Sequence, residues 1–211
     1  MQAAGRARSV TGPWMLTAFA VALAIAGVTL SLRGAGEAGT VLGLRLTARW
    51  SYLWFWSAYT ASAWASLLAP QLRSVGMRAR DFGLAFAAAH LVHLGLVVWL
   101  YRIAEHPPGA GSLEFFGVAV LFTYLLALLS FRRFAGWLTP RAASVIRTVG
   151  VEYIALAFLV DFAKDPLRPT LGHVLGYDVF LALGVLGYAL RVTTLVRRHQ
   201  THEPIGLHGP R

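Results

Sequence analysis

The stretch DFGLAFAAAHLVHLGLVVWLY, residues 81–101, decides the fold class of this chain. After its first residue it carries no acidic or basic side chain other than two histidines, His90 and His93. It is long enough to cross a bilayer, because about 20 apolar residues in a helix span a hydrocarbon core of roughly 30 Å. Ionisable groups at mid-membrane depth point to function by default. The stretch therefore predicts a membrane-spanning helix and a candidate site within it.

The composition of the whole chain indicates the same class. Hydrophobic residues make up 57% of the 211 residues, charged residues make up 13%, and the mean hydropathy is +0.60. These values lie outside the range of ordinary soluble domains. Cysteine is absent, which excludes disulfides, thiolate metal sites and cysteine nucleophiles. We therefore expect a multi-pass protein of the cell's inner (plasma) membrane, in contact with lipid.

Six apolar runs are long enough to count as spans. Bounded mostly by Pro and Gly clusters, they cover residues 14–32, 50–68, 82–101, 113–131, 143–162 and 175–196. The short connections predict one all-α, antiparallel six-helix bundle within residues 1–198, followed by a disordered cytoplasmic tail at 199–211. The segment GAGEAGTVLGLRLTARW, residues 34–50, is expected to be an outer loop with at most a short interfacial turn.

The distribution of basic residues predicts the orientation, because Lys and Arg in short loops are retained on the cytoplasmic side. One side of the predicted bundle collects most of them: Arg6, Arg8, Arg73, Arg78, Arg80, Arg132, Arg133, Arg141, Arg147, Arg191, Arg197 and Arg198. On the other side, acidic residues dilute the cations. Both termini should therefore be cytoplasmic. This asymmetry and the attraction to anionic lipid account for the net charge of +10 without a nucleic-acid partner.

A small set of polar residues lies within the predicted spans. His90 and His93, three residues apart on a helix, should present their imidazoles on one face. Glu152 is expected at similar depth in the parallel fifth span, with Arg147 about one and a half turns nearer the cytoplasm. Three interpretations are open for this cluster: histidine ligation of haem iron, a polar network that passes protons or holds a substrate, and structural hydrogen bonds between the third and fifth spans.

A further set of residues gives the chain a family likeness. The second span ends in SLLAP, the link QLRSVGMRARDFGL follows, and then comes FAAAHLVHLGLVVWLY with its mid-span histidine and later tyrosine. Over roughly residues 48–165 the chain resembles the ferric reductase-like transmembrane domain, whose bacterial members include the haem-binding membrane subunit of the methionine sulfoxide reductase system. The resemblance implies transmembrane electron transfer through b-type haem with axial histidines on the third and fifth helices. It makes His93 or His90 the inner ligand of the third helix, and His106 a candidate outer ligand.

The fifth span departs from that family pattern. It reads AASVIRTVGVEYIALAFLVDFAKD and contains no histidine, so the resemblance implies a haem held unusually, a haem shared with another subunit, or a haem-free relative. No segment resembles a flavin or nicotinamide domain, and an oxidoreductase activity would therefore depend on a redox partner protein or a membrane quinone. The competing hypothesis is a haem-free assembly subunit or a transporter. A cavity beside His93 would favour haem, whereas direct packing of the third and fifth spans through Ala87, Ala88 and Gly150 would not.

Overall fold

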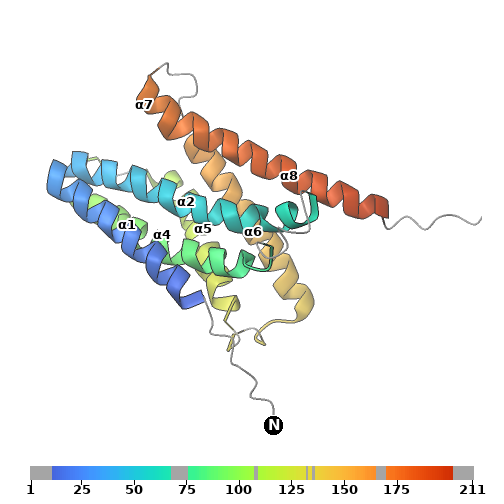
Figure 1. Cartoon of the computed structure of the whole chain (residues 1–211). Coiled ribbons are helices and arrows are strands. Elements are labelled where there is room, and N and C mark those ends of the chain that lie inside the picture. The colour runs from blue at the N-terminus through green and yellow to red at the C-terminus, as the bar shows by residue number, and fades with distance from the viewer. Residues whose placement is uncertain are drawn as a thin grey trace, which may run out of the picture.

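The computed structural model describes residues 11–67, 76–106, 109–131, 133–134, 136–164 and 170–201. These residues form helices and no strands: α1 (Thr11–Arg33), α2 (Glu37–Leu67), α4 (Ala79–Ile103), α5 (Ala110–Leu129), α6 (Pro140–Phe162), α7 (Leu171–His173), the π-helical turn η2 (Val174–Asp178) and α8 (Val179–Thr201) (Figure 1). Among them, α1, α4, α5, α6 and the run from α7 into α8 are long and apolar enough to cross a membrane. The chain is therefore an all-α protein of the multi-pass membrane type.

Helix α2 differs from the sequence-based expectation. It begins at Glu37, so most of the segment expected to be an outer loop is helical. Close packing explains the difference, since a Cβ at Gly43 would lie 3.0 Å from Thr29 Oγ1 of α1 and 3.2 Å from Leu96 of α4. The hydroxyls of Thr40, Thr47 and Ser51 donate back to carbonyls of their own helix. These three hydroxyls can thus lie buried with their hydrogen bonds satisfied within the helix.

Helices α1, α2 and α4 pack against one another as a three-helix group (Figure 1). Four alanines, Ala18 and Ala22 of α1 with Ala85 and Ala89 of α4, are 0% exposed and contact one another. Small residues four positions apart let two helix backbones approach closely, which is the main source of helix association in lipid. The indole Nε1 of Trp50 in α2 donates to the carbonyl of Ala18 at 2.9 Å, and this hydrogen bond holds α2 against the α1–α4 pair.

Helices α5 and α6 form a second pair, and α8 packs against both α2 and α6 (Figure 1). Gly150 allows the α5–α6 contact, because a Cβ there would lie 2.8 Å from the Phe122 ring. Thr139 caps α6 through its hydroxyl, which accepts from the Ala142 amide, and Pro140 occupies the first turn. Helix α8 ends at Thr201, and residues 202–211 of the predicted tail lie outside the described residues. Helices α2 and α4 on one side and the α5–α6 pair on the other enclose the candidate site.

Candidate functional site

His90 and His93 lie on the same face of α4, as their spacing predicts. The two rings are stacked, with centroids 5.1 Å apart and an interplanar angle of 19°. Phe86, one turn before His90, places its ring centroid 5.4 Å from the His90 ring. The helix therefore presents a short ladder of flat rings toward α5 and α6.

The two histidines line a partly open cavity of about 520 Å³. Its walls come from α2, α4, α5 and α6, with Tyr177 of η2 at one edge. The volume lies within the range of about 300–1,000 Å³ that is typical of small-molecule and cofactor sites. Ala87 and Ala88 are buried but do not line the cavity, and Gly150 packs on α5 rather than α4. The third and fifth predicted spans are thus separated by a cavity beside His93.

The cavity is apolar at one end and polar at the other. At the end near the start of α4 its walls include Phe86, Thr123 and Ile154. At the opposite end, where α4 and α6 finish and α5 begins, they carry the polar and charged groups Arg45, Tyr101, Ser112, Asp161, Lys164 and Tyr177. We call this polar end the mouth. The histidines lie between the apolar end and the mouth, as the order of residues along α4 requires.

Thr47 of α2 fixes the orientation of the His93 ring. Its Oγ1 lies 3.2 Å from His93 Nδ1 and 2.8 Å from the Gly43 carbonyl. The single hydroxyl proton is used in the bond to the carbonyl, so Oγ1 accepts from His93 and the proton is assigned to Nδ1. The other nitrogen, Nε2, then carries a lone pair. A second residue that fixes the tautomer in this way is the usual support of a metal-binding histidine.

His90 has a different environment. Its Nδ1 is buried and has no hydrogen-bond partner among the described residues. The ring of Tyr124 in α5 lies 6.4 Å from the His90 ring between centroids, and its hydroxyl is likewise buried and unpartnered among the described residues. Buried polar groups are normally hydrogen-bonded, so this pair marks a place where a ligand or water would complete the site.

The other residues that the sequence singled out lie elsewhere. His106 follows the end of α4, is exposed and does not line the cavity. Arg147 is exposed on α6. His173 stacks on Tyr177 with centroids 4.8 Å apart, and its Nε2 lies 4.0 Å from Asp178. Of the predicted site residues, only His90 and His93 are brought together at the cavity.

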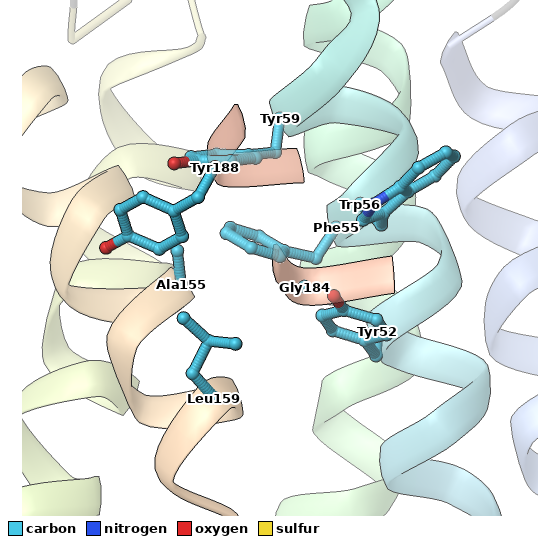
Figure 2. Close-up of a pocket in the computed structure, with 8 residues that line it drawn as sticks. All are labelled: Tyr52, Phe55, Trp56, Tyr59, Ala155, Leu159, Gly184 and Tyr188. Atoms are coloured by element: carbon cyan, nitrogen blue, oxygen red, sulfur yellow. The ribbon is translucent and has the colours of Figure 1, made fainter. Parts of the chain in front are cut away.

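Glu152 belongs to a separate polar network that joins α2, α6 and α8. Its carboxylate accepts a hydrogen bond of 2.9 Å from the Tyr59 hydroxyl and forms an ion pair with Arg191. The Arg191 guanidinium also lies over the Tyr59 ring, 4.9 Å from its centroid. Figure 2 shows Tyr59 of α2 beside Tyr188 of α8, above a pocket lined by aromatic residues. That pocket has a volume of about 10 Å³, which is room for a water molecule and not for a cofactor.

The cavity residues fit a haem held by one protein ligand. His93 Nε2 is an imidazole lone pair of the kind that binds haem iron. No methionine or cysteine lines the cavity, and all of its histidines come from α4. Two stacked imidazoles on one face cannot occupy opposite sides of one iron, so these residues would supply a haem with one ligand. No cluster of three metal-binding side chains occurs among the described residues.

Several residues of the site could not be found from the sequence. Thr47 and Arg45 fall in the segment expected to be a loop, and Tyr124, which faces the His90 ring without lining the cavity, carries no local signal. The spacing of Thr40 and Thr47, seven residues or two helical turns apart, is the one sequence pattern that indicates a buried helix face there.

Comparison with known proteins found no match for this chain among protein-family models, curated proteins or solved structures.

Proposed function

We propose that this protein is a haem b-binding membrane subunit that transfers electrons, related to the ferric reductase-like transmembrane domain. In this proposal α2 also crosses the membrane, which brings the number of spans to six. Both termini are then cytoplasmic, and the membrane is the plasma membrane. The observation that carries the proposal is the cavity of about 520 Å³ beside His93, whose proton is assigned to Nδ1 by the contact with Thr47, so that Nε2 keeps its lone pair. Such a cavity between the third and fifth predicted spans is what a bound macrocycle requires.

The chain's own residues have separable roles in this proposal. His93 would hold the iron, and Thr47 would keep its ring in the binding tautomer. The apolar walls, among them Leu94, Val97 and Phe158, would exclude water and lower the local dielectric. The haem, when bound, supplies a one-electron carrier. Because no flavin or nicotinamide segment is apparent, the electrons would come from a redox partner protein or a membrane quinone.

The competing hypothesis was a haem-free assembly subunit or a transporter built on His90, His93 and Glu152. Glu152 does not line the cavity, and its carboxylate is paired with Arg191 and Tyr59. An ion pair between α6 and α8, together with the hydrogen bond from Tyr59 of α2, is a sufficient structural role for it. The geometry thus supports a haem site more than a combined His–Glu transport site.

The haem content of protein purified from haem-replete cells tests this proposal. We expect wild-type protein to release protoheme on pyridine extraction in about equal amount to protein. His93→Ala should lose most of it, because the only oriented axial nitrogen is removed. His106→Ala is the matched control, since that histidine is exposed and outside the cavity, and it should retain haem. Wild-type protein that is helical and carries no haem would overturn the proposal.

A further inference from the structure

The charges of the cavity lie only at its mouth. Arg45 is exposed there and has no ion-pair partner among the described residues. Lys164 lies across the mouth, 2.6 Å from Asp161 and 5.2 Å from the centroid of the Phe116 ring. One acidic group therefore faces two cations, and it already pairs with one of them.

A third cation, Arg49 of α2, lies next to the mouth, in contact with Tyr177. The Arg49 guanidinium lies 4.9 Å from the centroid of the Tyr177 ring, and its Nε donates to the Gly176 carbonyl at 2.6 Å. Gly176 allows this approach, because a Cβ there would lie 2.9 Å from the guanidinium. Arg49 also interacts electrostatically with Asp161 and Arg45. The mouth consequently carries a net positive field next to an apolar interior.

From this arrangement we infer that the cavity takes an apolar ligand with carboxylate groups, and that Arg45 and Lys164 bind those carboxylates. The inference rests on the proposed function, for which the ligand is haem b and the carboxylates are its two propionates. It also fixes the orientation: the propionates point to the mouth and the apolar edge of the macrocycle points toward Phe86 and Ile154.

Physical considerations favour an acid over a neutral ligand. Arginine and lysine form shorter and stronger hydrogen bonds with a carboxylate than with an ester or hydroxyl group. A neutral ligand would leave Arg45 without a counter-charge at the edge of a low-dielectric cavity. The two cations are on opposite walls, α2 and the end of α6, so two carboxylates on one edge of a ligand would each meet one cation.

The test compares iron protoporphyrin IX with its dimethyl ester, which differs only in the acid groups. Equilibrium binding to purified wild-type protein in detergent should be tighter for the diacid, by up to about fivefold for each exposed cation. Arg45→Gln and Lys164→Gln should each reduce the preference for the diacid and leave ester binding unchanged. Asp161→Asn should increase it, because Asp161 is the one acid among the described residues that line the mouth. Arg102→Gln is the matched control, since this arginine ends α4 outside the cavity, and it should change nothing.

The outcomes separate this inference from the proposed function. Equal affinity for diacid and diester, both dependent on His93, would overturn the inference and retain haem binding. Dodecanoate serves as the probe for a lipid source of the carboxylate. If dodecanoate binds through Arg45 and neither porphyrin binds, the carboxylate mouth is supported and the haem proposal fails. If none of the three binds to helical protein, both are wrong.

Discussion

The hydroxyl of Thr47 lies 3.2 Å from Nδ1 of His93, and this contact couples α2 to α4 at the candidate site. Thr47 is 0% exposed, and His93 is 46 residues away in sequence. The acceptor therefore comes from a segment that contains no histidine. It assigns the proton of the His93 ring to Nδ1.

Replacement of Thr47 by valine should destabilise the protein. The change preserves shape but leaves the His93 N–H without this acceptor, and an unsatisfied buried group costs about 1–3 kcal/mol. Thr123→Val is the matched control, because the Thr123 hydroxyl is buried, lines the same cavity and bonds only to the Ala119 carbonyl of its own helix. Thermal unfolding followed by circular dichroism measures both. Equal effects of the two substitutions would refute the specific coupling.

Arg191→Gln should also destabilise the fold, through Glu152. The side chains of the pair are 28% and 34% exposed, so we expect about 1–3 kcal/mol, less than for a fully buried pair. Combining it with Glu152→Gln should recover part of the loss, since no charge then remains unpaired. Arg147→Gln, at an exposed position on the same helix as Glu152, should change stability by less than about 0.5 kcal/mol. Additive single effects would argue against the pairing.

Ala89→Leu should disrupt the contact between α1 and α4. The site is 0% exposed against Ala18 and Ala22, and overpacking of such a contact costs about 1–3 kcal/mol. The same substitution at Ala189, which is exposed on α8, adds the same atoms without a packed neighbour and serves as the control. The two variants should differ in unfolding temperature in detergent. An unfolding temperature for Ala89→Leu at or above that of Ala189→Leu would contradict the assigned packing.

Reporter fusions at the two termini test whether α2 crosses the membrane. Five helices are long and apolar enough to span, and α2, if it also crosses, raises the number of spans to six. An even number of spans places both termini on one side, and the distribution of basic residues puts that side in the cytoplasm. We therefore expect cytoplasmic reporter activity from both fusions and external activity from a fusion after His106. Termini on opposite sides would show that α2 does not span.

The helices were largely predictable and the contacts between them were not. Apolar runs located α1, α4, α5 and α6 to within a few residues, because membrane helices are specified by local composition. The start of α2 at Glu37 depends on Gly43 packing against Thr29 and Leu96, which is a tertiary effect. The spacing of His90 and His93 predicted their shared face.

The partners of the intramembrane charges lay beyond local sequence information. Arg191, which pairs with Glu152, is 39 residues away and was assigned only to the basic cytoplasmic side, while the nearer Arg147 is exposed. The cavity itself arises because α6 packs mainly on α5 and α8 and meets α4 through the rings of Phe86 and Phe158. Which helices leave space between them is decided by the whole bundle and not by any one helix.

Titration of iron protoporphyrin IX into the purified protein, followed at the Soret band, shows directly whether the cavity beside His93 binds haem. The haem proposal predicts a saturable shift that ends at about one equivalent per chain. It also predicts that His93→Ala weakens binding by about tenfold or more, while His106→Ala matches wild type. A helical wild-type protein with no saturable shift, or identical titrations for wild type and His93→Ala, would contradict the assignment of the cavity as a haem site.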